Sequence, residues 1–252
     1  MKDYPRKFYD ELKDSALPSA RRIVPLVRAL MTVRSVVDVG CGDGGWLKAF
    51  QESGVKNVVG IDGEWVRDDQ LLIAPEHLVR CALHEPLPLD RRFDLAVSLE
   101  VAEHIRPEFA ARFVAELARL APVVLFSAAV PDQGGLNHFN EQWPAVWAKL
   151  FEGYGYRSID TLRWQVWRDD AVTWWYKQNM LLFASEEALD RNAKLEAARK
   201  AAPPGPPLAV IHPEKFGGIA RRARPGLGRW LKMGPAALRR SLGRRPPGDG
   251  AS

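Results

Sequence analysis

Residues 36–46 read VVDVGCGDGGW and are the most informative stretch of the sequence for the fold. Apolar residues typical of a buried strand run directly into four closely spaced glycines, and an aromatic residue then opens an amphipathic segment. Glycine tolerates positive φ angles and lets another group approach the backbone closely. Backbone N–H groups at the start of a helix bind anionic groups. We therefore expect a strand, a tight turn and a helix that together hold a ligand.

The charges around the turn indicate which ligand it holds. Glycines 40, 42 and 45 fit the spacing G-x-G-x-x-G of dinucleotide sites. Asp38 and Asp43 flank the turn, however, and two carboxylates would repel a pyrophosphate. A ligand with an ammonium and a sulfonium, such as S-adenosylmethionine, matches them better, and its own carboxylate can use the helix N-terminus. The phosphate-binding pattern G-x-x-x-x-G-K-[ST] does not occur in the sequence.

A further acidic residue ends the next predicted strand. The stretch VVGID at residues 58–62 places Asp62 22 residues after Gly40. A carboxylate at this position can accept hydrogen bonds from both hydroxyls of a ribose. The turn, helix, strand and acidic residue together predict a nucleoside-binding unit.

Short apolar runs alternate with amphipathic segments over residues 1–184, which is typical of an α/β sheet. No crossover helix of ordinary length is evident between the last two strands, so we expect an antiparallel pair at the sheet edge. The predicted helices span 43–53, 107–120 and about 141–152, with two more at 5–14 and 19–30. The predicted strands span 35–39, 57–62, 77–81, 93–99, 122–126, 156–161 and 178–184.

With these elements in place, the sequence resembles the class I S-adenosylmethionine-dependent methyltransferases. The matching stretches are residues 36–44, 58–62 and FDLAVSLEVAEHI at 93–105. FYD at 8–10 and HFNEQW at 138–143 are similar to bacterial small-molecule methyltransferases that often accompany surface-polysaccharide enzymes. The resemblance implies an α/β, Rossmann-like, seven-stranded and mostly parallel sheet of order 3-2-1-4-5-7-6, with helices on both faces. It also implies a cofactor over the carboxyl ends of strands 1, 2 and 4.

The same resemblance assigns residues to S-adenosylmethionine. Asp38, Gly40 and Gly42 would line its methionine part. Asp62 would hold the ribose, and Gly63 would lie beside the adenine.

After the third strand this chain departs from the family pattern. The family usually has an acidic residue there for the adenine amino group, whereas this chain has Ala82. We expect the adenine to rest on backbone groups of Ala82 and Leu83, or on the ring of Trp65. Of the acids after the fourth strand, we expect Glu100 to orient cofactor or substrate and Glu103 to be a surface residue, although the opposite assignment is open.

Two histidines are candidates for catalysis. His104 follows the fourth strand and His138 lies in the loop after the fifth, so both should face the cofactor. A hydroxyl acceptor must lose a proton, and we expect His138 to be the general base, with His104 as the weaker candidate. Six of the nine tryptophans fall between Trp143 and Trp175, which favours a saccharide acceptor. We assign no metal site from the sequence.

Two other functions stay open. An RNA ribose methyltransferase would use the basic tail to bind phosphates. A scaffold that binds the cofactor without chemistry is suggested only by Ala82. Nucleobase methylases are disfavoured, because the fourth strand ends in SLEV and because Cys41 and Cys81 do not follow that strand.

The basic charge of the chain is concentrated near its end. The whole sequence carries 36 Lys+Arg against 31 Asp+Glu, whereas residues 201–252 carry 10 against 2, with 9 of the 19 prolines. Such a composition buries too little apolar surface to offset the entropy of the chain. We expect N-terminal helices capping the active site at 1–34, a methyltransferase domain at 35–184, and a disordered linker and tail at 185–252. Residues from about 201 onward should be dispensable for folding, although 227–245 could form a helix on an anionic surface.

Composition also bounds the compartment and the partners. Two cysteines exclude a disulfide scaffold and a four-cysteine zinc site, and no apolar run approaches the ~20 residues of a membrane span. We expect a cytoplasmic protein whose partner is a small-molecule substrate. We expect no specific nucleic acid, and the sequence does not indicate an oligomeric state.

Overall fold

The computed structural model describes residues 6–203, 205 and 207–223 of the chain. The chain divides into two units, residues 1–210 and 211–252, and the first contains the sheet and the site. No helix in the described part of the chain is long and apolar enough to cross a membrane.

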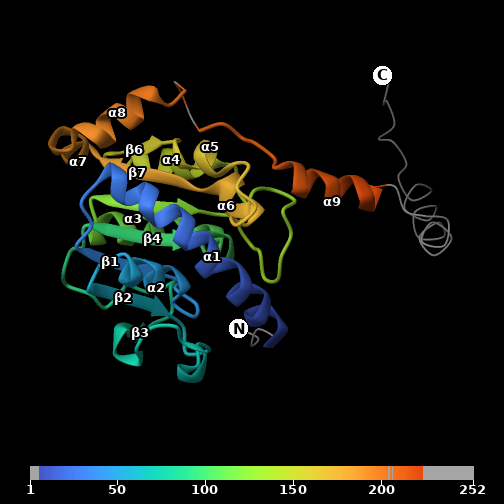
Figure 1. The fold of residues 1–252 in the computed structure, drawn as a ribbon, viewed down its shortest axis with the longest axis horizontal. Helices are drawn as coiled ribbons and strands as arrows, with labels where there is room; N and C mark the ends of the chain where they lie inside the picture. Colours follow the sequence, from blue (N-terminus) through green and yellow to red (C-terminus); the bar gives the residue numbers. More distant parts are fainter. Residues whose placement is uncertain (1–5, 204, 206, 224–252) are drawn as a thin grey trace, which may run out of the picture. The chain divides into compact units, whose positions relative to one another are not determined.

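A seven-stranded sheet forms the centre of the first unit (Figure 1). Its order is β3-β2-β1-β4-β5-β7-β6, so the predicted order is confirmed. The first five strands pair in parallel, whereas β7 is antiparallel to both β5 and β6, as expected for the sheet edge. The strands are β1 Ser35–Val39, β2 Asn57–Asp62, β3 Leu78–Arg80, β4 Leu95–Leu99, β5 Val123–Ser127, β6 Tyr156–Ile159 and β7 Leu181–Ser185.

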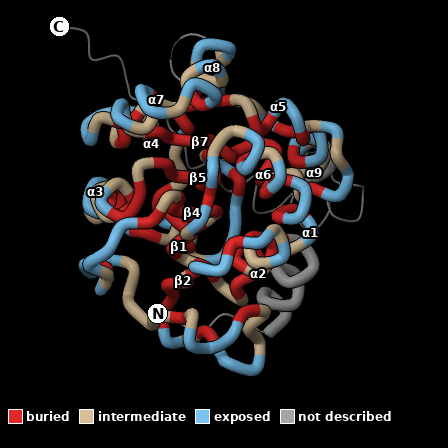
Figure 2. The backbone as a smooth tube through the Cα atoms, turned by 60° about the vertical axis from the view of Figure 1, so that its left-hand side comes forward, coloured by how far each residue is buried: buried red, intermediate tan, exposed pale blue. Residues whose placement is uncertain are grey.

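Successive strand residues point to opposite faces of the sheet, and each face is covered by helices. Leu95 and Val97 of β4 join a core cluster with α1, α2, α5 and α8, whereas Ala96 joins the cluster of α3 and α4. Figure 2 shows the central strands as buried and much of α3, α7 and α8 as exposed. The two buried faces explain why the strands read as nearly continuous apolar runs.

Three predicted helices are present with shorter bounds. They are α2 Gly45–Glu52, α3 Ala110–Leu120 and α4 Pro144–Glu152, and a 3₁₀ turn at Pro107–Phe109 precedes α3. Two short helices, α5 Leu162–Val166 and α6 Trp174–Asn179, lie between β6 and β7. Because α6 extends to Asn179, β7 begins three residues later than the predicted strand at 178–184. Other 3₁₀ turns lie at Asp68–Gln70, Pro75–His77 and Ala102–His104.

The prediction of two separate N-terminal helices is wrong. One helix, α1 Arg6–Leu30, contains both Pro18 and Pro25. A proline inside a helix removes one backbone hydrogen bond and usually kinks or breaks the helix. The apolar face that includes Ile23 and Val27 is fully buried against the sheet, and this burial compensates for the lost bonds.

The segment after β7 is helical rather than a disordered linker. α7 spans Glu186–Arg191 and α8 spans Ala193–Ala201. The side chain of Ser185 caps α7 by accepting the N–H of Ala188, and the side chain of Asn192 caps α8. In the second unit, α9 spans Pro213–Ala223, and the predicted amphipathic stretch 227–245 lies outside the described residues.

Arg163 shows where the dispensable part of the chain begins. This fully buried guanidinium donates to Asp160, to the carbonyl oxygen of Gln178 and, over 3.1 Å, to that of Leu208.

A chain ending at Val210 should melt at the temperature of the full protein. A chain ending at Lys200 lacks the carbonyl oxygen of Leu208, so one buried N–H of Arg163 loses its acceptor. An unsatisfied buried donor lowers the free energy of unfolding by about 1–3 kcal/mol, and each kcal/mol lowers the melting temperature by roughly 2–4 °C. Calorimetric melting of both truncated chains checks this boundary, and equal melting temperatures would contradict it.

Candidate active site

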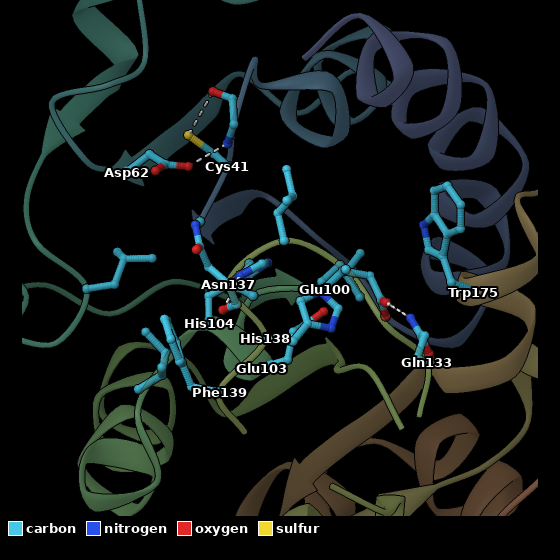
Figure 3. A pocket seen from close by; sticks show the side chains of 18 of the residues that line it. Cys41, Asp62, Glu100, Glu103, His104, Gln133, Asn137, His138, Phe139 and Trp175 are labelled. Carbon is cyan, nitrogen blue, oxygen red and sulfur yellow. Dashed lines mark hydrogen bonds between the residues drawn. The ribbon is translucent and has the colours of Figure 1, made fainter. Parts of the chain in front are cut away.

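A cavity of about 1050 Å³ opens at the carboxyl ends of the central strands. Its walls come from the glycine turn after β1, the end of β2, the loops after β4 and β5, and α6. Figure 3 shows Asp62 and Cys41 toward one end of this cavity and the cluster of His104, His138 and Glu103 near its middle. The predicted cofactor turn and the predicted catalytic histidines therefore share one cavity.

The glycine turn is shaped by hydrogen bonds to β2. Gly40 has φ +85° and donates its N–H to the carbonyl oxygen of Ile61 over 2.7 Å. A Cβ on Gly40 would lie 2.4 Å from a methyl carbon of Val101, so this position requires glycine. Gly42 has φ +53°, and a Cβ there would meet no described atom within 4 Å. The turn thus leaves space at Gly42 for a ligand to lie against the backbone.

Asp62 lies at the end of β2, and its side chain is hydrogen-bonded to the glycine turn. Its carboxylate accepts the N–H groups of Gly42 and Gly63 over 2.7 Å each, and the Trp65 side chain also donates to it. Burial raises the pKa of Asp62 above its usual value, while these three donors act in the opposite direction. The carboxylate lines the cavity, so it is held rigidly where a ribose hydroxyl could reach it.

Asp38 lies behind the cavity wall, at 2% exposure. Its Oδ2 atom has no hydrogen-bond partner among the described residues. Burial first, and then the nearby charges of Asp62 and Asp43, raise the pKa of Asp38 well above its usual value. A positively charged ligand close to the turn would stabilise the ionised form of Asp38 and offset the cost of burying it.

The part of the cavity expected to hold the adenine has different walls from those predicted. The Trp65 ring covers Gly63, because a Cβ on Gly63 would lie 2.2 Å from two of its ring carbons. Trp65 and Leu83 line the cavity, whereas neither Gly63 nor Ala82 is among its described walls. The ring of Trp65, rather than the backbone of Gly63 or Ala82, is thus the surface available to a flat base.

Glu100 sits directly after β4 in a left-handed conformation, with φ +57°. Asn179 donates to both of its carboxylate oxygens, at 3.0 and 3.2 Å, and Gln133 donates to one at 2.8 Å. Burial raises the pKa of Glu100, although these amides act against it. Glu100 lines the cavity and fixes the loop after β5 to α6.

The two histidines lie edge to face, with ring centroids 4.9 Å apart. Nδ1 of His138 lies 2.8 Å from Oε1 of Glu141, and Nδ1 of His104 lies 3.2 Å from the carbonyl oxygen of Asn137. Burial, and then the neighbouring His138, lower the pKa of His104 to about 4. His104 is therefore neutral at neutral pH.

Glu103 is buried, so it is not the surface residue that the sequence allowed. It is 1% exposed, and its Oε2 atom has no hydrogen-bond partner among the described residues. Burial, and then the charge of Glu100, raise the pKa of Glu103 well above its usual value. Its carbonyl oxygen accepts the N–H groups of Phe139 and Asn140, which ties down the loop that carries His138. The spacing of Glu103 and His104 within one 3₁₀ turn is the signal that could have identified it.

The tryptophans divide between core and cavity. Trp147 is buried at 2% exposure, whereas Trp143 and Trp164 are exposed. Trp174 and Trp175 both line the cavity. They begin the short helix α6, where neighbouring side chains diverge by less than they do in a strand.

Comparisons with known proteins agree with this architecture. Residues 9–179 match a family model described as a methyltransferase domain. No curated protein matches the chain.

Several solved structures share the fold. The sugar N-methyltransferase KedS8 from Streptoalloteichus has 14% identity and a TM-score of 0.55, and the match covers 73% of this chain and 94% of KedS8. The amino pentose methyltransferase CalS10 from Micromonospora echinaspora has 14% identity and a TM-score of 0.53, covering 73% and 98%. Magnesium protoporphyrin IX methyltransferase from Synechocystis, solved with bound SAH, has 19% identity and a TM-score of 0.51, covering 69% and 86%. At these identities the likeness shows the shared fold.

Proposed function

The chain belongs to the family of methyltransferase domains and uses S-adenosylmethionine, and we propose that it methylates a hydroxyl group of a small polar acceptor, a saccharide or a related metabolite. The observation that carries the proposal is the single cavity that joins the glycine turn to the cluster of His104, His138 and Glu103. Cofactor and acceptor must lie in one enclosed space for direct transfer, because aligned reactants gain most of the acceleration.

The residues of the turn suit this cofactor. The orphaned buried oxygen of Asp38 lies behind the turn, where it favours a cationic ligand. The open space at Gly42 admits the ligand against the backbone, and Asp62 offers a carboxylate to the ribose. When bound, S-adenosylmethionine supplies an electrophilic methyl group on a sulfonium.

The histidine cluster supports a hydroxyl acceptor. A hydroxyl is a poor nucleophile until its proton is removed or its oxygen is polarised. Glu141 accepts a hydrogen bond from Nδ1 of His138, so Nε2 is the ring nitrogen that would take the proton of the acceptor. The predicted role of His138 in acceptor activation stays a prediction, and this geometry supports it.

The aromatic wall supports a saccharide acceptor. Trp174 and Trp175 line the cavity, as do the exposed side chains of Leu136 and Phe139. Aromatic faces pack well on the C–H surfaces of sugars. Two proteins of the same fold are described as acting on a sugar and on an amino pentose, so the architecture accommodates such acceptors.

Replacing Trp175 with alanine tests the aromatic wall. We expect the KM for the saccharide acceptor to rise roughly 2- to 10-fold, since an aromatic contact contributes about 0.5–1.5 kcal/mol. The KM for S-adenosylmethionine should stay the same. Trp164→Ala is the matched control, because Trp164 is 43% exposed and lies outside the described cavity wall. Equal effects of the two substitutions on acceptor KM would contradict the proposal.

A further inference from the structure

The cavity that contains the glycine turn and the histidine cluster has an uneven distribution of charge. Arg106 is the one lysine or arginine among the cavity walls that the structure describes. Four acidic residues also line the cavity, namely Asp43, Asp62, Glu100 and Glu103. We propose that Arg106 binds an anionic group of the acceptor, a phosphate or a carboxylate, so that the acceptor is an anionic saccharide. This inference rests on the proposed function and narrows its acceptor class.

The guanidinium group of Arg106 is not paired with an acid. Within the described residues it forms no hydrogen bond and no ion pair, and its contact is with the ring of Phe139, whose centroid lies 6.0 Å from Cζ. Glu103 and Glu108 are the nearest acids along the chain, and neither forms an ion pair with it. A guanidinium carries five N–H donors. Those of Arg106 are therefore available to a ligand in the cavity.

The surroundings of Arg106 are apolar and anchored. Leu136 and Phe139 line the cavity and are 47% and 53% exposed, so they lie where the cavity meets the solvent. The N–H of Phe139 donates to the carbonyl oxygen of Glu103 over 2.8 Å, and the carbonyl oxygen of Arg106 accepts the N–H of Phe109. These bonds fix the backbone on both sides of the contact. Apolar groups that exclude water strengthen the attraction between a guanidinium and an anion.

The charges of the cavity would bind an anionic acceptor in one orientation. An anionic group deeper in the cavity would meet the carboxylates, which repel it strongly where the dielectric constant is low. Figure 3 shows Phe139, the ring that Arg106 contacts, on one side of the histidine cluster and Trp175 on the other. An acceptor with its charged end at Arg106 would therefore extend its hydroxyl groups toward His138. Arg106 would in this way select both the acceptor and the end of it that is methylated.

Arginine rather than lysine at this position indicates the shape of the anion. The planar guanidinium presents its donors as a rigid fork that matches two oxygens of one phosphate or carboxylate. A saccharide can carry either group, as a phosphate ester or as the carboxylate of a uronic acid. The cavity of about 1050 Å³ exceeds the roughly 300–1,000 Å³ typical of a site for one drug-sized ligand. It therefore has room for the cofactor together with a charged saccharide.

Calorimetric titration of the complex with S-adenosylhomocysteine tests the site, with glucose 1-phosphate, glucuronate and glucose as the probes. The wild type should bind one of the two charged sugars roughly 10- to 100-fold more tightly than glucose, and the tighter one identifies the anion. Arg106→Ala should lose this preference, and Arg106→Lys should keep part of it, because the charge remains and the fork is lost. Arg112→Ala is the matched control and should keep the preference. Arg112 is also exposed and lies over a phenylalanine ring, that of Phe109 at 5.0 Å, but it is not among the described cavity walls.

The affinity of each variant for S-adenosylhomocysteine reports both folding and the cofactor site. Arg106→Ala should bind S-adenosylhomocysteine as the wild type does, and a marked loss would overturn the inference by assigning Arg106 to the carboxylate of the cofactor. A wild type that binds the three sugars equally, or binds none of them, also overturns it, and the proposed function then stands with a neutral acceptor. Preference for a charged sugar, without methyl transfer to the hydroxyl of any saccharide, would instead refute the proposed function and leave the anion site intact.

Discussion

Replacement of His138 by alanine is expected to lower kcat by about 10²–10⁴-fold, the range typical of a group that assists proton removal. His104, the other ring of the edge-to-face pair, is not expected to replace it, because Nδ1 of His104 is bound to the carbonyl oxygen of Asn137. Affinity for S-adenosylmethionine should be nearly unchanged, since Asp62, the predicted ribose ligand, lies toward another end of the cavity. Steady-state kinetics with the labelled cofactor measure both quantities.

His84→Ala serves as the control for this substitution. His84 also lines the cavity, but it packs against Phe109, with ring centroids 5.8 Å apart, and not against the cluster. Its replacement should leave kcat within a few-fold of the wild type. Full turnover by His138→Ala on the true acceptor would refute the role of His138. The acceptor would then be an acidic group such as a carboxylate, or catalysis would rest on positioning alone.

Asp62→Ala is expected to weaken cofactor binding by about 10²–10⁴-fold. Two charge-assisted hydrogen bonds to a ribose contribute about 1.5–3 kcal/mol each before compensation by water. The substitution also releases the N–H groups of Gly42 and Gly63, so the turn loses the acceptor that fixes its shape. Calorimetric titration with S-adenosylhomocysteine gives the affinity, and the melting temperature reports on the turn.

Asp69→Ala provides the comparison for Asp62. Asp69 follows on the same connection after β2, and its side chain is 63% exposed, paired with Arg67 at the surface. Surface pairs of this kind contribute little, so cofactor affinity should not change. Unchanged affinity in Asp62→Ala, or tighter binding of a nicotinamide dinucleotide by the wild type, would show that the turn holds another ligand.

The elements that the sequence predicts well are those with local signals. Consecutive apolar residues and the glycine turn locate β1 and β2, and the acid at the end of β2 is close enough in sequence to be recognised with them. The caps of α7 and α8 are also local. Ser185, followed by two acids, and Asn192 are residues that favour helix starts, but the basic and proline-rich composition downstream obscured them.

The features that the sequence does not predict depend on contacts between distant segments. Glu103 becomes buried because the loop after β5 is hydrogen-bonded to its carbonyl oxygen through the N–H of Phe139. Phe139 lies 36 residues further along the chain. The orientation of His104 depends on the carbonyl oxygen of Asn137, and that of Glu100 on the amide of Asn179. No spacing rule along the chain encodes such pairs, so the cluster emerges only once the sheet places the two loops side by side.

O-methylation of a saccharide is tested by transfer of a deuterated methyl group from S-adenosylmethionine to a panel of saccharides and RNA, with mass spectrometry of the products. We expect the wild type to form a deuteromethyl ether on a saccharide hydroxyl, and His138→Ala to form much less of it. Labelling of RNA alone would contradict the proposed acceptor. If a protein that binds S-adenosylmethionine transfers no label to any hydroxyl-bearing acceptor, the claim that this cavity carries out O-methylation is wrong.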